Sequence, residues 1–248
     1  MSFKCSVFSF KGEPRSTSSL QTEHLNLKTS SMSPTAFLEQ SLASGIHRIG
    51  QIELRADGSG FQLFHADDLT VIDQPDHGLT VHRDPESARD ISTYAEDGTY
   101  RFTKGQTNLK RGWLMLLDSL EDTRRAIDHF YPAALGLVAA QREGTLQIET
   151  LREKLNRQTG MYRFARNISD AGAQQLVQEV CGPAHQCAKW ILWKLDADTP
   201  LDDSAASRFR GIPGELPETE AIPLVCREAC NHFVAECRKV SKAEHAAS

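Results

Sequence analysis

Five of the six cysteines in this 248-residue chain fall between positions 181 and 237. Cys181 and Cys187 have five residues between them, and Cys226 is followed by Cys230 after three residues and by Cys237 after six more. Single free cysteines are commonly buried as small apolar side chains. Five in the last quarter of a chain indicate instead a site where two pairs of thiolates meet around a metal centre.

Four thiolates suit an iron–sulfur cluster or zinc, because soft metal ions favour sulfur ligands. Structural zinc sites usually take each pair from a tight turn with two to four intervening residues, whereas the first pair here has five. Cys226 and Cys230 would share one face of a helix predicted over residues 224–240. Cys237 would lie about 16 Å from Cys226 along the axis of this helix and is a poor fifth candidate for a ligand. Both metals remain open on spacing alone.

Length and composition describe an ordinary globular protein of one or two domains. The net charge of −5 gives no indication of nucleic-acid or membrane-surface binding. No apolar stretch approaches the roughly 20 residues that span a bilayer. No secretory signal is visible, and a chain this long does not need disulfides to fold, so we expect a cytoplasmic protein with reduced cysteines.

The first half of the chain predicts a mixed α and β structure. Residues 1–31 are rich in Ser, Thr and Lys and are expected to be disordered, with Met32 as an alternative start. Apolar alternation around a glycine-rich turn at 57–60 predicts a β-hairpin. Further predicted strands are 71–72, 79–82, 99–103 and 113–117, with helices over 35–44 and 85–94.

The second half is predicted to be mainly helical. Ser119 and Asp122 have the spacing of a capping box, which opens a helix that Tyr131-Pro132 must interrupt after Phe130. Short extended pieces are expected at 146–149 and 160–164. Further helices are predicted over 133–142, 150–156, 171–180 and 224–240, and the acidic, proline-rich residues 196–223 predict a long loop between the cysteine pairs.

No catalytic motif is recognisable. A glycine-rich phosphate loop, a nucleophile elbow and a His-Glu-x-x-His string are all missing from the sequence, so enzymatic activity stays undecided. Of the histidines, His185 and His232 alone are placed to bond to a metal cluster, and surface positions are the ordinary explanation for both. Clusters of arginine and lysine near 110, 124 and 152–166 are the pattern of a solvated surface, and the alternative is a site for a carboxylate-rich tetrapyrrole or for the acidic face of a partner.

Several strings between about Tyr100 and Arg238 resemble a known family. They lie at residues 108–113, 130–136, 157–163, 190–193 and 223–231, together with Cys181 and Cys187. Their order is similar to that in the appended domains of a small bacterial family, best known from a deinococcal multidomain protein. In that family a CbiX-like, sirohydrochlorin-type chelatase fold is joined to a stabilising domain and a [4Fe–4S]-binding domain.

The resemblance implies a cluster-ligand role for Cys181, Cys187, Cys226 and Cys230. It does not extend to the chelatase part, because residues before Tyr100 are too few and too poor in βα alternation for such a domain. A redox or accessory role in tetrapyrrole (siroheme-type) metabolism is implied, with a redox or tetrapyrrole-pathway protein as partner. The alternatives are a structural zinc-binding interaction protein and an interaction module whose thiols are simply buried.

We therefore predict an α+β protein. Its mixed N-terminal domain has antiparallel hairpins and helices and is followed by a mainly helical iron–sulfur domain. The expected parts are a disordered segment at 1–31, a stabilising-type domain at 32–166, a cluster-binding domain at 167–240 and a disordered tail at 241–248.

Overall fold

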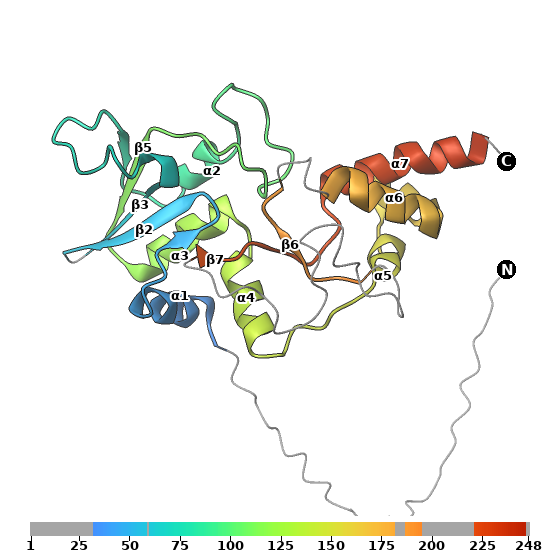
Figure 1. Ribbon diagram of the computed structural model, residues 1–248, viewed down its shortest axis with the longest axis horizontal. Helices are drawn as coiled ribbons and strands as arrows, with labels where there is room; N and C mark the ends of the chain where they lie inside the picture. The colour runs from blue at the N-terminus through green and yellow to red at the C-terminus, as the bar shows by residue number, and fades with distance from the viewer. Residues whose placement is uncertain (1–31, 59, 182–186, 195–220, 247–248) are drawn as a thin grey trace, which may run out of the picture. The chain divides into compact units, whose positions relative to one another are not determined.

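The computed structural model describes residues 32–58, 60–181, 187–194 and 221–246. All of them belong to one compact unit, Ser31–Ser248. The predicted disordered segment 1–31, His185 and most of the predicted loop at 196–223 lie outside the described residues. Within those ranges the chain combines helices with a mixed sheet, which confirms the α+β prediction (Figure 1).

The larger sheet has six strands. In spatial order they are β4 (Thr80–His82), β5 (Trp113–Leu117), β3 (Gly60–His65), β2 (Ile52–Asp57), β1 (Arg48–Ile49) and β7 (Ala221–Ile222). The β4–β5 and β1–β7 pairs are parallel, and the other pairs are antiparallel. The predicted hairpin is confirmed: Asp57 faces Gly60 across the β2–β3 turn, where Gly58 takes a positive φ of 58°.

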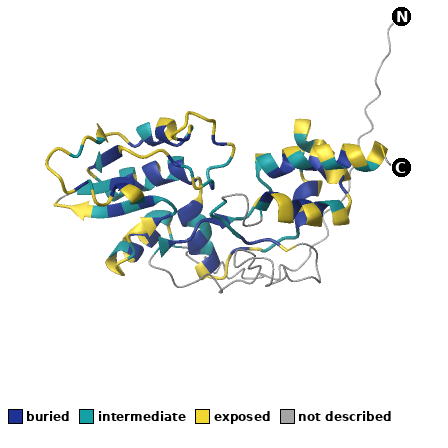
Figure 2. Ribbon diagram, turned by 45° about the horizontal axis from the view of Figure 1, so that its top comes forward, coloured by how far each residue is buried: buried dark blue, intermediate teal, exposed yellow. Residues whose placement is uncertain are grey.

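One face of this sheet is covered by α1 (Pro34–Ala43), α3 (Leu120–Phe130) and α4 (Ala134–Arg142), with α2 (Ser87–Ile91) packed on α3. Leu63 and Met115 are fully buried on that face, as strand alternation requires. Phe64 and Leu114 point to the other face and pack with Ile72, just beyond η1 (Ala66–Asp68). Figure 2 shows buried residues along the strands and the inner sides of the helices. We call the larger cluster the sheet core.

The predicted start and stop of α3 are confirmed. Ser119 Oγ accepts a hydrogen bond from the Asp122 N–H at 3.1 Å, which satisfies one of the free donors of the first turn. The helix ends at Phe130, and Ala133 then adopts a left-handed φ of 60° before α4 begins. This break turns the chain so that α4 packs against α1.

A second group of apolar side chains, which we call the helical core, lies among four helical elements in the second half of the chain. These are α5 (Leu151–Asn156), η2 (Gly160–Asn167), α6 (Asp170–Cys181) and α7 (Asn231–Ala246). Helices α6 and α7 lie side by side (Figure 1). A two-stranded parallel sheet, β6 (Trp190–Ile191) with β8 (Val225–Cys226), carries the chain into this core, where Trp193 and Phe233 are almost fully buried.

The prediction of a helix over 224–240 is wrong for its first residues, and the predicted helix ends too early. Val225 and Cys226 form β8, because their backbone groups pair with β6 instead of with a helical turn. Helix α7 starts at Asn231 and continues to Ala246, so residues 241–246, expected to begin a disordered tail, are helical here. Buried Ser241, on the same side as Cys237, explains why the helix continues.

Four predicted extended pieces also differ from the structure. Residues 71–72 lie in turns, and 99–103 form only an isolated bridge between Tyr100 and Tyr94. Residues 146–149 pair with no strand of either sheet in the described part of the chain, and 160–164 lie in the 3-10 helix η2. Short apolar runs favour strand by composition, but a strand also needs a free neighbouring edge.

Candidate metal centre

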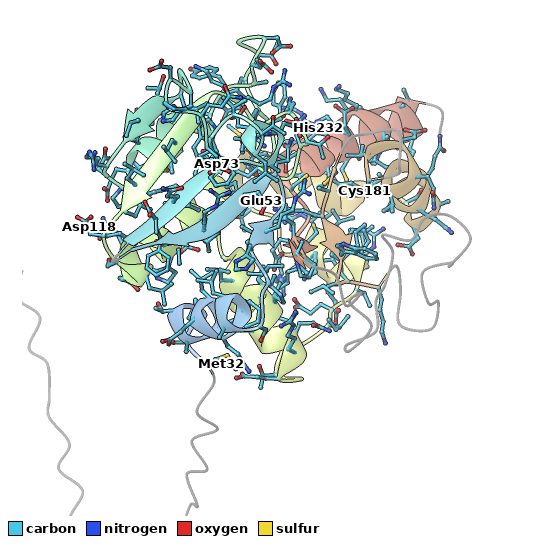
Figure 3. All side chains as sticks on the ribbon, turned by 60° about the vertical axis from the view of Figure 1, so that its left-hand side comes forward. Met32, Glu53, Asp73, Asp118, Cys181 and His232 are labelled. Carbon is cyan, nitrogen blue, oxygen red and sulfur yellow. The ribbon has the colours of Figure 1, made fainter. Side chains whose placement is uncertain are left out.

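The four cysteines predicted as cluster ligands line one cavity. Its volume is about 70 Å³, and its wall contains Cys181, Cys187, Cys226 and Cys230. Each of these residues is partly exposed and none forms a disulfide. Figure 3 labels Cys181 on α6 and His232 at the start of the neighbouring α7; His232 lines the same cavity. The fold thus brings together two pairs that are 38 residues apart in the sequence.

Cys230 occupies the N-cap position of α7. Its carbonyl oxygen accepts the Val234 N–H at 3.0 Å, and its Sγ accepts the Phe233 N–H at 3.5 Å. The first N–H groups of a helix lack partners within the helix and favour negative charge nearby. A thiolate at Cys230 is therefore stabilised by the backbone of α7. The sequence prediction that Cys230 shares a helix face with Cys226 missed this role.

Cys226 is held at the end of β8. It pairs with Ile191 of β6, and its carbonyl oxygen accepts the Leu192 N–H at 2.9 Å. In the thiol form its Sγ–H donates to the carbonyl oxygen of Glu228 at 3.1 Å. The short turn from Cys226 to Cys230 therefore curls around the cavity, and both thiols lie on its wall.

Cys187 is positioned by a loop that comes from far earlier in the chain, residues 101–108. It forms a bridge with Gln106, and the next residue, Ala188, donates its N–H to the Gly105 carbonyl oxygen at 2.8 Å. A β-carbon at Gly105 would lie 2.8 Å from Cγ of Lys189, so the two segments are in close contact. Thr103 and Gln106 of this loop also line the cavity.

The 101–108 loop is shaped by a buried arginine. Arg101 is 2% exposed, and burial lowers the pKa of its guanidinium. The guanidinium donates to the Asn108 side-chain oxygen and to the carbonyl oxygens of Ser92, Lys104 and Gln106. These acceptors fix the loop that carries Thr103 and Gln106 to the cavity. Sequence reasoning missed Arg101, because nothing in its neighbourhood distinguishes it from a surface arginine.

Apolar side chains close much of the cavity wall. They are Val180, Ile191, Trp193 and Phe233, all buried in the helical core. Trp193, from the string 190–193 that is similar to the family, lies on this wall. Two buried polar atoms of wall residues, Trp193 Nε1 and Gln106 Oε1, have no hydrogen-bond partner among the described residues.

Cys237 stands apart from the other four. It is fully buried within the helical core and is not among the residues that line the cavity, and burial raises the pKa of its thiol to about 12. A thiol in that setting is a small apolar side chain. The sequence-based exclusion of Cys237 as a fifth candidate agrees with this position, and Cys5 lies outside the described residues.

Burial is the main influence on the thiols of the cavity. It raises the pKa of Cys181 strongly, and the neighbouring sulfurs of Cys226, Cys230 and Cys187 raise it further. It also raises the pKa of Cys226 to about 11, although the nearby Lys189 ammonium opposes the change. These groups are neutral thiols at neutral pH, and binding of a cation would release their protons.

An ion-pair network ties the Cys226–Cys230 turn to α5. Lys154, whose side chain is fully buried, donates from Nζ to Glu149 at 2.9 Å and lies 3.6 Å from Glu228. Arg157 pairs with the same two carboxylates. Glu228 lies between the two cysteines and lines the cavity. The cations near 152–166, expected to be solvated, are in part these structural partners.

The donor chemistry and the space of the cavity fit an iron–sulfur cluster. Four thiols line the cavity, thiolates are the usual ligands of such clusters, and the volume is several times the roughly 10–15 Å³ that a water needs by the same measure. Among the described residues, no group of three His, Cys, Asp or Glu side chains is arranged to hold a metal ion. None of the described helices has the length and apolar content to cross a bilayer.

Comparison with known proteins divides the chain into two matched segments. Residues 36–142 match the model of the DR2241 stabilising domain, and residues 143–239 match a 4Fe-4S iron-sulfur cluster binding domain. No curated protein matched the chain.

A crystal structure of DR2241 from Deinococcus radiodurans superposes with a TM-score of 0.64 at 26% identity. That structure is described as a multi-domain protein with structural similarity to chelatases and with two additional novel domains. The match covers 85% of this chain but 41% of DR2241, so this chain spans about two fifths of that protein's length. The resemblance inferred from sequence is confirmed.

Proposed function

We propose that this chain, in which a stabilising segment precedes an iron–sulfur segment, binds a [4Fe–4S] cluster through Cys181, Cys187, Cys226 and Cys230. The observation that carries the proposal is the shared cavity: these four thiols line it, and the fifth, Cys237, is buried elsewhere. All four lie within the segment 143–239 that matches the cluster-binding model.

The zinc alternative receives less support. A zinc ion holds its sulfur ligands at about 2.3 Å in a tight tetrahedron, which leaves no open space between them. The thiols here border a cavity of about 70 Å³ instead. The spacing of five residues within the first pair and the match to a cluster-binding model favour the cluster as well.

The residues of the cavity have distinct tasks in this proposal. The four cysteines supply thiolate ligands, and the Phe233 N–H at the start of α7 stabilises the charge on Cys230. Val180, Ile191 and Trp193 exclude water from the thiolates. A [4Fe–4S] cluster in this place would supply one-electron transfer. The Arg101 loop and the Lys154 network keep Cys187 and the Cys226–Cys230 turn in position.

The wider role that we propose is redox or accessory support of tetrapyrrole (siroheme-type) metabolism in the cytoplasm. It is supported by the chelatase-like description of DR2241. The proposed partner is a redox protein or an enzyme of that metabolism. Mixing the reduced protein with a candidate electron acceptor and following cluster absorption tests the redox part, and an accessory role predicts no electron transfer.

Metal analysis of protein purified without oxygen tests the cluster itself. We expect brown protein with broad visible absorption and with iron and inorganic sulfide in equal amounts, about four of each per chain. A colourless protein that contains one zinc ion and no sulfide would contradict the proposal, because Zn²⁺ has a full d shell and does not absorb visible light.

A further inference from the structure

Trp193 presents a buried hydrogen-bond donor without an acceptor. The side chain is 1% exposed, and its Nε1–H has no hydrogen-bond partner among the described residues. An indole N–H can only donate, and burying it without an acceptor is unfavourable. Trp113 shows the ordinary arrangement, because its Nε1 donates to the Lys110 carbonyl oxygen at 2.6 Å. An acceptor is therefore expected beside Trp193 in the working state of the protein.

Trp193 and Cys226 line the same cavity. Cys226 lies opposite Ile191 in the parallel β6–β8 pair, and residues in register point to the same face. Trp193 follows Ile191 by two residues, at a bend just beyond β6. All three residues line the thiol cavity. The indole and the Cys226 sulfur thus lie on one wall.

The hydrogen bonding of Cys226 must change when the residue loses its proton. Its Sγ–H now donates to the Glu228 carbonyl oxygen at 3.1 Å, and a thiolate has no proton to donate. The thiolate becomes an acceptor, and the carbonyl oxygen no longer suits it. The Trp193 indole lies within reach of the Cys226 sulfur, although its nitrogen makes no hydrogen bond of normal geometry to the thiol.

We infer that Trp193 Nε1–H donates a hydrogen bond to the Cys226 thiolate when the cluster is bound, and that this bond sets the reduction potential of the cluster. The inference rests on the proposed function. A hydrogen bond to a ligating sulfur stabilises the more negative, reduced state more than the oxidised state, so it raises the potential. Trp193 acts here as a positioning and tuning residue, and the iron ligands stay the four cysteines.

Lys189 is the other group that acts on Cys226. It lines the cavity and lowers the pKa of the same thiol through its charge. Its effect on the potential should weaken as salt is added, because an ammonium close to solvent is screened. The effect of a buried neutral donor should not depend on salt. A Lys189→Met variant therefore separates the two contributions.

The test compares Trp193→Phe with wild-type protein loaded with its cluster. We expect unchanged iron and sulfide content and a reduction potential shifted to more negative values at every salt concentration. Resonance Raman spectra should show Fe–S(Cys) bands of the wild-type protein that shift in D2O, and this shift should shrink in the variant. Trp190→Phe is the matched control, because Trp190 packs against the sheet core; it should retain both the potential and the D2O shift.

The smaller phenylalanine leaves space in a buried site, and loss of the cluster could follow from poor packing alone. Benzothienylalanine has the same shape as tryptophan, with sulfur in place of the N–H. Replacing Trp193 by this residue therefore separates the loss of the hydrogen bond from the loss of packing. The isostere should bind the full cluster and show the same negative shift. A fully loaded isostere with wild-type potential and wild-type D2O sensitivity would overturn the inference. Absence of iron from the wild-type protein would instead overturn the proposed function.

Discussion

The sheet core and the helical core are stabilised in different ways. The sheet core takes large apolar side chains from a six-stranded sheet and three long helices, and its central members, such as Leu63 and Met115, have no exposure. The helical core has fewer members, no large sheet beneath it and one side formed by the thiol cavity. Burial alone can hold the first. The second has the thiol cavity, where four bonds to a ligand would complete it, so its stability should depend on that ligand.

Replacing the ligands should give the largest effect. Cys181→Ser, Cys187→Ser, Cys226→Ser and Cys230→Ser should each lose most of the bound iron, because each removes one thiolate from the cavity wall. Iron and sulfide assays on each purified variant measure the loss.

Cys237→Ala is the control for this series. Its sulfur is buried in the helical core away from the cavity, so the variant should keep its iron even if its melting temperature falls. Full iron content in any of the first four variants would remove that cysteine from the ligand set.

Removing the iron should loosen the helical core and spare the sheet core. A ligand that binds the folded state alone stabilises it by about 2.7 kcal/mol at a hundredfold excess over its dissociation constant. Hydrogen exchange after chelation should therefore speed up in α6 and at the start of α7, while β2, β3 and β5 keep their protection. Equal loss of protection in both cores would show that they unfold together.

Neutralising Glu149 should have a smaller effect, confined to the cluster site. Glu149→Gln removes the charged partner of buried Lys154 and leaves it with Glu228 at 3.6 Å. The Cys226–Cys230 turn should then move more freely, and iron should leave several-fold faster in the presence of a chelator.

Glu121→Gln is the matched control for Glu149→Gln. Glu121 also accepts hydrogen bonds from an arginine, Arg124, and its pKa is likewise lowered to about 2, but it lies on α3 beside the sheet core. Its iron release should equal that of the wild type. If the two variants release iron at the same rate, the Lys154 network does not hold the site.

The pH dependence should be the smallest difference. Hydrogen bonds from Arg157 and Lys154 lower the pKa of Glu149 from 4.5 to about 2. A carboxylate with a depressed pKa contributes stability that is present above its unfolded pKa and is lost as pH falls through the folded value. The unfolding free energy should therefore fall between pH 4.5 and 2, and less steeply in Glu149→Gln. Parallel curves for the two proteins would contradict this.

Local signals predicted much of the sheet core. The cap at Ser119, the break at Tyr131-Pro132 and the glycine turn of the β2–β3 hairpin each act within a few residues, so the sequence alone is sufficient to place them. Strand β7 was missed, since Ala221–Ile222 is two residues long and becomes a strand only by pairing with β1, about 170 positions earlier.

The cysteines were identified from their spacing, but the way they are held was not. A gap of four between Cys226 and Cys230 has helical periodicity, yet in the fold the first residue ends a strand and the second caps a helix. The supporting groups, Arg101 and Lys154, act through tertiary contacts with loops far away in sequence. Such contacts leave no local pattern for sequence analysis to detect.

The pairing of β7 with β1 also decides how this chain can be divided. The segment matched from residue 143 onward supplies β7 and the side chains of Leu192, Ile222 and Leu224 to the sheet core. A protein shortened to end at Arg142 would expose the hydrogen-bonding edge of β1 beside an apolar gap, and such edges recruit strands from other molecules. The two segments match separate family models, but both contribute to the sheet core. Recombination or protein engineering therefore has to transfer them together.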